Sequence, residues 1–553
     1  MQSDPSIAPE QPPHDAPRAR PSGPAPGAGR VGRLARHLVV LAPLLLLLGT
    51  GQRGIDFGKH WDERVQVEVL HTAIDTQTLL PKWYRYPSVI FWLTLGSLTP
   101  EILAQIPHTA AEMKATQASL NATVESPEFR LRTRSLFLFV TCLTVLWTYL
   151  LALSWHGRAL EGFLAASCVG LSWEVAYHAR WIAPDGILMQ FSALTLLLLV
   201  LAVSRRNARW LVAAALSAGL ACGTKYTGGI LLLPLFVAAA QVWAQRPVAE
   251  RILRSAGLAL VFVFAFVLST PGALLQPYIF TRHVGFEIEH YRTGHYGSSI
   301  EAGLPHLAAM GRYISTHLFS HQAVLALVVS ICAAIGFVGS VRRAPRMALL
   351  LACFPIVYVL YMSTQRVLFV RNLLLVAPII AVFAAHGATT LLTGLQGKKR
   401  PESASRGRPA GVLAAGLLIA VVWLVNGSFL IRAGEGIRER DHDADVRAFS
   451  SWADDRTDLR LYISDRVARD MARLQLALPI NGIRDRAAEV DAAAFFPAEL
   501  APDVQLAANR PGTALAIFGA LDVNFAFYPA WKEPKLLVYP ATAARAAGIL
   551  SDG

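Results

Sequence analysis

Two adjacent carboxylates, Asp62 and Glu63, follow His60 and Trp61 just beyond the first strongly apolar run of the chain. An acid pair at a membrane surface suits general-base catalysis. One carboxylate can take a proton from an acceptor hydroxyl, while the other orients it or tunes its pKa. A solvated acid pair in a loop is the alternative interpretation, and the spacing of the two residues does not decide between them.

Aromatic and basic residues come next, in the segment Lys82–Ser88, immediately before the apolar stretch Val89–Leu98. This composition is typical of anchors at a membrane interface. The alternative is a wall or lid for an amphiphilic substrate, in which Tyr84 and Tyr86, together with the lysine, reach a phosphate.

Two short connections between apolar runs carry charged residues. The first contains Arg180 and Asp185, which either pair with each other at the membrane boundary or contact a substrate. The second contains Lys225, between Thr224 and Tyr226. Charges at such a boundary are costly and often functional. A lysine there either extends to the interface or supplies a point charge for a phosphate.

A later segment, Glu287–Gly297, contains His290 and His295. With Glu287 these histidines could bind a metal, but their spacing is not a recognised ligand pattern. We therefore predict a substrate-gating loop and no firmly implied cofactor, with a divalent metal as the alternative. Further polar residues expected on the same face are Gln365, Arg366 and Arg371.

The elements that must position these residues are apolar helices. Hydrophobic residues make up 54% of the 553-residue chain and charged residues only 16%, whereas a soluble domain has about 25% charged residues. A helix needs about 20 apolar residues to span a bilayer. Runs that approach this length, with their flanks, are Leu38–Thr50, Leu136–Leu153, Leu188–Val203, Ile230–Trp243, Leu258–Thr270, Val324–Val338, Met347–Tyr361, Leu373–Ala385 and Val412–Val425.

Basic clusters predict the orientation of these helices. They lie near residues 205–209, 246–254, 342–346 and 398–400. With the arginine-rich N-terminus inside, all four clusters fall in cytoplasmic loops, as the positive-inside rule requires. This placement explains the net charge of +13 without nucleic acid. It predicts a multi-pass protein of the inner (plasma) membrane with about 11 spans, and it puts the candidate site residues on the outer face.

Three regions follow from the same pattern. Residues 1–32 are predicted to be a disordered cytoplasmic tail, and residues 33–430 a transmembrane domain with long outer loops at 51–132 and 272–317. Residues 431–553 are predicted to be a small extracytoplasmic α/β domain. Its expected strands are Leu459–Ile463, Leu515–Phe518 and Leu536–Tyr539.

The order of these features resembles the GT-C membrane glycosyltransferases. Within them the chain is most similar to glycosyltransferase family 39, the protein mannosyltransferases and aminoarabinose transferase relatives. The matching elements are the acid pair after the first span, Tyr86-Pro87, Ala179-Arg180 followed by Asp185, and Thr224-Lys225. The segments Ser269–Leu275, Glu289–His295 and Arg366–Pro378 also resemble bacterial and archaeal members, so that the resemblance covers roughly residues 34–430.

The resemblance implies roles for individual residues. Asp62 matches the catalytic acid of the family's first loop, with Glu63 as its neighbour. Lys225 matches the position near the donor phosphate. Asp185 matches the acid of the next outer connection, with Arg180 ahead of it. The oligosaccharyltransferase motif Trp-Trp-Asp-Tyr-Gly is absent from the sequence, which argues against transfer of a whole glycan.

The function expected from these features is inverting glycosyl transfer. A hexose or pentose would move from a polyprenyl-phosphate donor to a hydroxyl of a protein, lipid or polysaccharide on the extracytoplasmic face. Membrane lipids would be partners, and nucleic acid would not. The alternatives are a polytopic transporter or lipid flippase, which predicts charges near mid-membrane and paired repeats, and a non-catalytic polymer-binding membrane protein.

Overall fold

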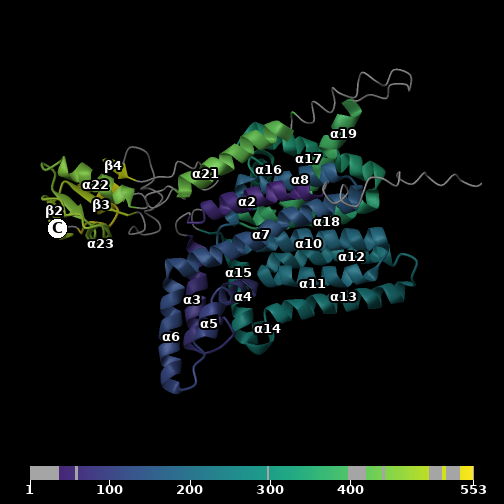
Figure 1. Cartoon of the computed structure of the whole chain (residues 1–553), viewed down its shortest axis with the longest axis horizontal. Coiled ribbons are helices and arrows are strands. Elements are labelled where there is room, and N and C mark those ends of the chain that lie inside the picture. Colours follow the sequence, from purple (N-terminus) through teal and green to yellow (C-terminus); the bar gives the residue numbers. More distant parts are fainter. Residues whose placement is uncertain are drawn as a thin grey trace, which may run out of the picture. The chain divides into compact units, whose positions relative to one another are not determined.

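The structure is a computed structural model, and it describes residues 37–56, 60–295, 298–395, 417, 419–438, 443–496, 514–518 and 536–551. It is mainly helical, with one small sheet formed by residues near the C-terminus (Figure 1). The predicted tail, residues 1–32, lies outside the described residues, as does part of the last predicted span at about 410–428.

Six helical segments of the described chain are long and apolar enough to cross a membrane. They are α7 (Pro127–His156), α10 (Pro184–Arg205), α13 (Val248–Ser269), α17 (Ala323–Arg343), α18 (Pro345–Ser363) and Val370–Thr393, which combines η3 (Val370–Val376) with most of α19 (Ala377–Leu395). Shorter apolar segments are η1 with α2 (Leu38–Val40 and Leu41–Arg53), α8 (Ala159–Gly170), α11 (Ala208–Thr224), and η2 with α12 (Tyr226–Leu231 and Leu232–Val242). The chain is therefore a multi-span membrane protein, as expected, whereas the count of 11 spans stays a prediction.

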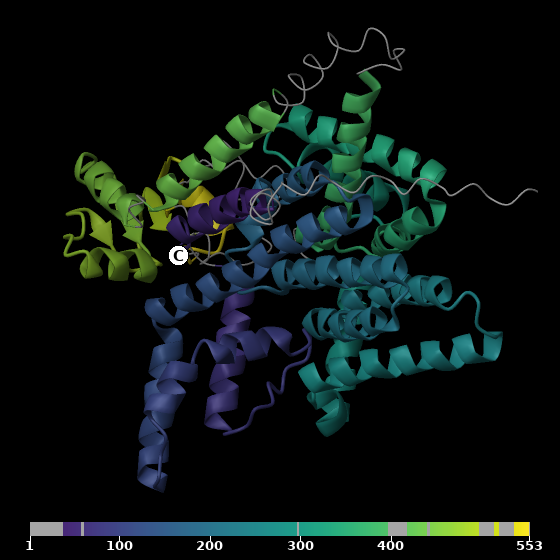
Figure 2. The same ribbon diagram turned by 45° about the vertical axis from the view of Figure 1, so that its right-hand side comes forward.

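The apolar helices pack closely where their facing residues are small. Figures 1 and 2 show α10, α11 and α13 running side by side. A Cβ atom on Gly219 of α11 would lie 2.5 Å from the carbonyl oxygen of Phe262 on α13, so only glycine allows this approach. Lipid tails are as apolar as leucine, so the burial of apolar side chains does not drive helices together in a membrane. Close packing of backbones at small residues is the usual cause of their association.

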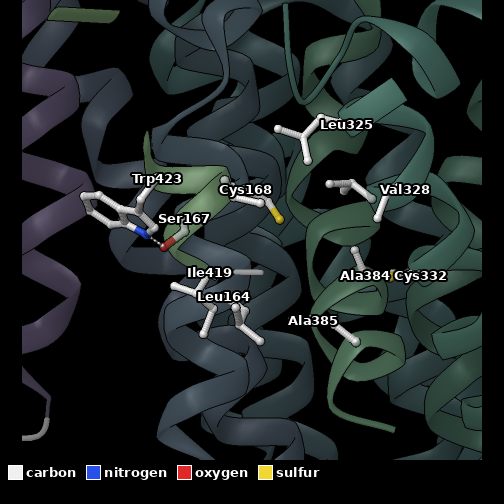
Figure 3. A pocket seen from close by; sticks show the side chains of 13 residues that line it. Leu164, Ser167, Cys168, Leu325, Val328, Cys332, Ala384, Ala385, Ile419 and Trp423 are labelled. Carbon is white, nitrogen blue, oxygen red and sulfur yellow. Dashed lines mark hydrogen bonds between the residues drawn. The ribbon is translucent and has the colours of Figure 1, made fainter. Parts of the chain in front are cut away.

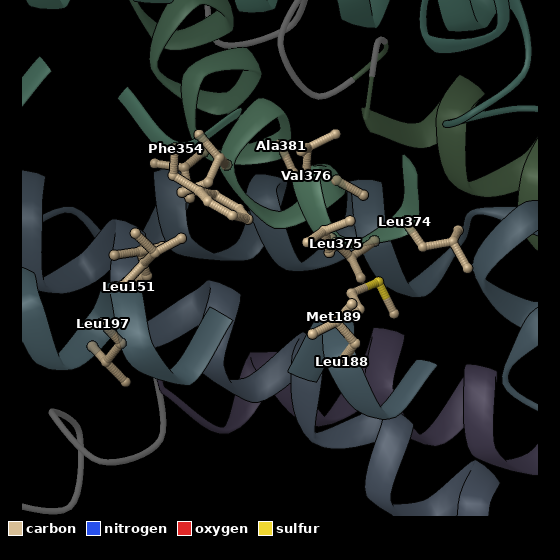
Figure 4. Close-up of a cluster of buried hydrophobic side chains, with 14 of the residues drawn as sticks. Leu151, Leu188, Met189, Leu197, Phe354, Leu374, Leu375, Val376 and Ala381 are labelled. Atoms are coloured by element: carbon tan, nitrogen blue, oxygen red, sulfur yellow. The ribbon is translucent and has the colours of Figure 1, made fainter. Parts of the chain in front are cut away.

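A continuous apolar core joins α7, α10, α18 and η3. Figure 4 shows Leu151 of α7, Leu197 of α10, Phe354 of α18 and Leu375 of η3 in this core, and all four side chains are buried. Because η3 enters this core directly, the residues at its start are fixed against α10. This contact brings together segments that are far apart in the sequence.

Both long connections predicted between spans are themselves largely helical. The first contains α3 (Trp61–Asp75), α4 (Val89–Gly96), α5 (Thr99–Ala104) and α6 (Ala110–Glu125). The second contains α14 (Gly272–Leu275), α15 (Pro277–Thr293) and α16 (Leu304–Thr316). A further short helix, α9 (Trp173–His178), precedes α10. In α6 the side chain of Thr109 and that of Glu112 form a capping box, which explains where this helix begins.

The C-terminal region contains a five-stranded mixed sheet of order β2-β1-β3-β5-β4. Its elements are η5, a π-helical turn (Trp423–Gly427), α21 (Ser428–Arg438), α22 (Ala444–Asp454), β1 (Leu461–Ile463), α23 (Asp465–Arg473), β2 (Gly482–Ile483), β3 (Ala492–Phe495), β4 (Ala516–Phe518), β5 (Leu536–Pro540) and α25 (Ala541–Ala546). Strand β1 pairs in parallel with β2 and β3, and β5 pairs antiparallel with β3 and β4. The predicted fold class, mainly helical with a small α/β region, is confirmed.

Candidate active site

Asp62 lies in the first turn of α3 and forms an ion pair with Arg371 of η3. The Nη2 atom of Arg371 is 3.2 Å from Oδ2 of Asp62, and both side chains are buried. His60 caps the helix, because its Nδ1 accepts a hydrogen bond from the backbone N–H of Asp62 at 3.2 Å. The cap fixes the start of α3, and through it the place of the carboxylate.

Arg371 also contacts a second carboxylate, Asp185, and so joins two acids. Its Nε atom is 3.2 Å from Oδ2 of Asp185. Lys225 completes the group, with Nζ 2.9 Å from Oδ1 of Asp185 and 2.6 Å from the side-chain oxygen of Asn372. Two carboxylates and two cations balance in charge, which is the condition for burying them together. Asp62, Asp185, Lys225, Arg371 and Asn372 are called the ionic cluster below.

Helix ends favour the charges of this cluster. Asp185 lies in the first turn of α10, where the aligned peptide dipoles favour negative charge. Lys225 caps the C-terminus of α11, where they favour positive charge. Pro184 at the first helical position supplies a backbone dihedral suited to the start of α10. These local signals place Asp185 and Lys225 at the ends of their helices, where the two side chains form an ion pair.

Glu63 points away from the ionic cluster, into a separate buried ion pair. Its two carboxylate oxygens accept hydrogen bonds from Nε and Nη2 of Arg134 at 2.8 and 2.6 Å. The backbone N–H of Ile182 donates a further bond at 3.2 Å. Arg134 is fully buried on α7 and also donates to the carbonyl of Ile55 at 3.1 Å. These bonds connect α3 to α7, so we assign Glu63 a structural role.

Neutral aromatic groups surround the cluster. Burial, together with the charge of Asp62, raises the pKa of the Tyr86 phenol well above its ordinary value, so the phenol keeps its proton. Burial, together with the charge of Arg371, lowers the pKa of His60 well below its ordinary value. Burial likewise lowers the pKa of His178 to about 3. Both imidazoles are therefore neutral at physiological pH.

The histidine segment reaches the edge of the cluster. Nε2 of His290 lies 2.9 Å from Nδ1 of His295. The ring of His295 contacts that of Phe369, and the guanidinium of Arg371 lies 4.6 Å from the centre of the Phe369 ring. In addition, the phenol of Tyr291 lies 3.3 Å from the side-chain nitrogen of Asn372. The end of α15 thus contacts Asn372 of the cluster, and the gating role of this segment stays a prediction.

Three residues predicted for the site have other partners. Arg180 is fully buried and donates to the carbonyls of Ala176 at 2.9 Å and Thr50 at 3.3 Å, so it satisfies backbone groups near the C-terminus of α2. Tyr84 donates from its hydroxyl to the side chain of Gln276 at 2.6 Å. The side chain of Arg366 is exposed, although its backbone N–H bonds to the carbonyl of Tyr291 at 2.8 Å.

Two cluster residues, Arg371 and Asn372, were not singled out by the sequence analysis. Arg371 was expected only as one of several polar residues on this face, and Asn372 was not expected at all. The sequence does contain a signal for Arg371. It is the single charged residue, counting Lys, Arg, Asp and Glu, within Val370–Thr393. A lone charge at the start of a span is a functional candidate by default.

Within the described residues, one group of three side chains brings its potential metal-ligand atoms together, namely His156, Glu161 and His386. The predicted alternative of a metal at Glu287, His290 and His295 is not such a group among these residues. An apolar cavity of about 60 Å³ lies beside α8, α17 and α19 (Figure 3). Ser167, whose hydroxyl oxygen accepts a hydrogen bond from Trp423, is the polar exception in its lining, so it offers little chemistry.

Comparisons with known proteins bear on part of the chain. Residues 112–287 match the family model of dolichyl-phosphate-mannose-protein mannosyltransferase. This segment contains Asp185 and Lys225, but not Asp62 or Arg371. The resemblance to family 39 is thereby confirmed for this stretch. No curated protein matches the chain by sequence.

Solved structures of two proteins are also similar in part. ArnT from Cupriavidus metallidurans in the apo state is 14% identical with a TM-score of 0.48, covering 93% of this chain and 99% of its own. The same ArnT bound to undecaprenyl phosphate is 14% identical with a TM-score of 0.45, covering 92% and 98%. The archaeal oligosaccharyltransferase AglB from Archaeoglobus fulgidus, with an inhibitory peptide and a dolichol-phosphate, is 12% identical with a TM-score of 0.45, covering 83% and 61%.

Proposed function

We propose that this chain is an inverting glycosyltransferase that moves a sugar from a polyprenyl-phosphate donor to a hydroxyl acceptor. The observation that carries the proposal is the ionic cluster, in which Arg371 joins the carboxylates of Asp62 and Asp185 beside Lys225. The match of residues 112–287 to the mannosyltransferase family supports the same class of reaction.

Asp62 is the general base in this proposal. Its carboxylate takes the proton of the acceptor hydroxyl, whose oxygen attacks the anomeric carbon. The bond from that carbon to the phosphate oxygen breaks, and polyprenyl phosphate leaves with the bonding electrons. Positioned proton transfer of this kind contributes about 10²–10⁴-fold in rate. Arg371 places an opposite charge 3.2 Å from this carboxylate.

Lys225 and Arg371 are the groups proposed to bind the leaving phosphate. Both are cations held near helix ends by Asp185. Fixed charges that do not need to reorganise stabilise negative charge developing in the transition state. We assign this part to Arg371 rather than to Arg180 or Arg366, because Arg371 contacts both acids. The donor's apolar tail would stay among the spans, and the site would face the extracytoplasmic side.

The test is transfer by purified full-length protein from radiolabelled polyprenyl-phosphate sugars. We expect Asp62→Asn to lower the rate by about 10²–10⁴-fold while binding of the donor persists. Glu68→Gln is the matched control, because Glu68 lies on the same helix and is exposed. Equal rates for wild type and Asp62→Asn would remove Asp62 as the base. No transfer with any donor would favour a flippase or a polymer-binding protein.

A further inference from the structure

A second group of chemically capable side chains lies at the other end of α7. Arg134, the partner of Glu63, is near the start of this helix, and His156 is its last residue. An α-helix rises 1.5 Å per residue, so roughly 33 Å of helix separates residue 134 from residue 156. The hydrocarbon core of a bilayer is about 30 Å thick. α7 is therefore long enough to hold Arg134 and His156 at opposite boundaries of a membrane that it crosses.

Local sequence fixes the position of His156. Gly157 adopts a left-handed backbone with φ of 70° and ends α7, as a C-terminal glycine commonly does. The chain then turns into α8, which carries Glu161 in its first turn. The third member, His386, comes from α19, which packs against both α7 and α8. Three separate helices thus bring one side chain each to the same point.

Both imidazoles converge on one oxygen of Glu161. Nδ1 of His156 is 2.6 Å from Oε2, and Nδ1 of His386 is 3.3 Å from the same atom. All three ligand atoms lie within 4.8 Å of one another. Zinc bonds of about 2.0–2.2 Å in a tetrahedral site separate neighbouring ligand atoms by roughly 3.4 Å. The distance from Nδ1 of His386 to Oε2 of Glu161 is close to this separation, and the distance from Nδ1 of His156 is shorter.

Other partners hold the second oxygen of Glu161, while the first, Oε2, faces the two imidazoles. The other oxygen of Glu161, Oε1, accepts bonds from Thr389 at 2.9 Å and Arg158 at 3.2 Å, which orient the carboxylate. Outer partners of this kind are usual for carboxylates that bind metals. An ion bound here would replace the contacts that Nδ1 of His156 and Nδ1 of His386 make with Oε2 of Glu161 at 2.6 and 3.3 Å.

Ring stacking holds both imidazoles in place. The rings of His156 and His386 are stacked at 4.2 Å with an angle of 10° between their planes, and Trp155 stacks on His156 at 4.1 Å. The side chains of His156, Glu161 and His386 are only 12%, 1% and 9% exposed. Arg158 brings a positive charge near the group, but its side chain is 60% exposed and its field is screened by solvent.

We propose that His156, Glu161 and His386 bind a divalent transition-metal ion, with Zn²⁺ as the ion best suited to two imidazoles and a carboxylate. The ion would join α7, α8 and α19 at the membrane face opposite the ionic cluster. It would act as a structural clamp on the helix that carries Arg134 and on the helix that continues from η3. This proposal does not depend on the glycosyltransferase proposal.

The test uses the full-length protein, purified with an affinity tag that lacks histidine. After treatment with a chelator and dialysis against ZnCl₂, bound zinc is measured by mass spectrometry, and the melting temperature is measured with and without zinc. We expect wild type to gain about one zinc per chain and to melt at a higher temperature with zinc. Replacing zinc with Co²⁺ should give the visible absorption bands of a tetrahedral site.

Variants locate the site. The double variant His156→Gln/His386→Gln should lose this zinc and its thermal effect, whereas His386→Cys should keep the zinc because a thiolate replaces the imidazole. The matched control, His317→Gln/His321→Gln, removes two half-buried histidines elsewhere and should bind zinc as wild type does. The proposal fails if wild type binds no zinc, or if the double variant binds as much as wild type.

Discussion

The neighbouring carboxylates of Asp62 and Glu63 have different partners, although both lie in the first turn of α3. Glu63 accepts three hydrogen bonds, two from Arg134 and one from the backbone of Ile182. Asp62 instead pairs with Arg371 in the ionic cluster. Arg134 occupies both carboxylate oxygens of Glu63, which is therefore poorly placed to accept a substrate proton, whereas Arg371 contacts Asp62 through Oδ2. The pair therefore divides into a structural acid and a candidate base.

Glu63→Gln should destabilise the protein, because it removes the closer of the two carboxylates that pair with the buried guanidinium of Arg134 and leaves only the half-exposed Asp56 at 3.5 Å. Breaking a buried ion pair from one side costs about 3–5 kcal/mol, which should appear as a clear fall in melting temperature in detergent. The exposed control Glu68→Gln should change stability by less than about 0.5 kcal/mol. A Glu63→Gln protein that melts like wild type yet transfers no sugar would contradict this division and give Glu63 a direct catalytic part.

Arg371→Lys should weaken transfer while keeping the positive charge. An ammonium is a point charge and cannot hold two carboxylates at once, as the planar guanidinium does. We expect the loss of one of these two ion-pair contacts to lower kcat/KM about 10- to 100-fold, which corresponds to about 1.4–2.7 kcal/mol. The comparison is Arg366→Lys, at an exposed position nearby in the sequence. A larger loss in Arg366→Lys than in Arg371→Lys would reverse the assignment of the phosphate-binding arginine.

Sequence reasoning could find some members of the ionic cluster and not others, for a physical reason. Asp62, Asp185 and Lys225 are charged residues at the ends of apolar runs, and their energetic cost there marks them in the sequence. Arg371 adjoins a run that was assigned as a span, so its role depends on a contact with residues far away in the chain. The pairing of Glu63 with Arg134 is likewise a tertiary contact, and no local pattern encodes it.

At the scale of elements, glycines decide how closely α17 and α19 approach. A Cβ atom on Gly336 of α17 would collide with the backbone carbonyl of Phe383 on α19, and one on Gly387 with the carbonyl of Cys332. At these two glycines, each helix therefore packs directly against the backbone of the other. The glycines lie beside His386, so this contact also places one of the proposed metal ligands.

Gly336→Ala should destabilise the protein by about 1–3 kcal/mol, the usual cost of an added methyl group in a packed interior. Gly339→Ala is a control on the same helix, because its Cβ would meet nothing nearer than His386 Nε2 at 3.8 Å. Alanine also favours helix by about 1 kcal/mol over glycine, so this control should be neutral or more stable. The measurement is melting temperature in detergent, and equal losses in both variants would rule out close packing as the cause.

Strand prediction in the C-terminal region failed where local propensity is weak. The three predicted strands correspond to β1, β4 and β5, with small shifts at their ends. The missed strand β2 has only two residues, and β3 is Ala492–Phe495, mostly alanine. Alanine has low strand propensity, and β3 is strand only because it pairs with β1 on one side and β5 on the other. Tertiary pairing, which sequence patterns do not show, decides this element.

At the scale of the whole molecule, the ionic cluster and the basic residues occupy opposite ends of the same helices. α10 has Asp185 in its first turn and Arg205 as its last residue, and the helix is roughly 33 Å long. α11 runs back from Ala208 to Thr224 and ends beside Lys225. The alternation predicted from apolar runs and basic clusters is consistent with this arrangement. The proposed reaction requires the end of α10 that carries Asp185 to face away from the cytoplasm.

Cysteine labelling in intact cells tests that orientation. The five native cysteines would be replaced, and single cysteines introduced by Leu79→Cys, just beyond α3, and by Asn207→Cys, in the turn between α10 and α11; both positions are exposed. A membrane-impermeant thiol reagent should label the first variant in intact cells and the second only after the membrane is opened. This follows because arginines favour the cytoplasmic loops, and Arg205 and Arg206 adjoin Asn207. Labelling in the reverse order would place Asp62 on the cytoplasmic side, where an extracytoplasmic acceptor could not reach it.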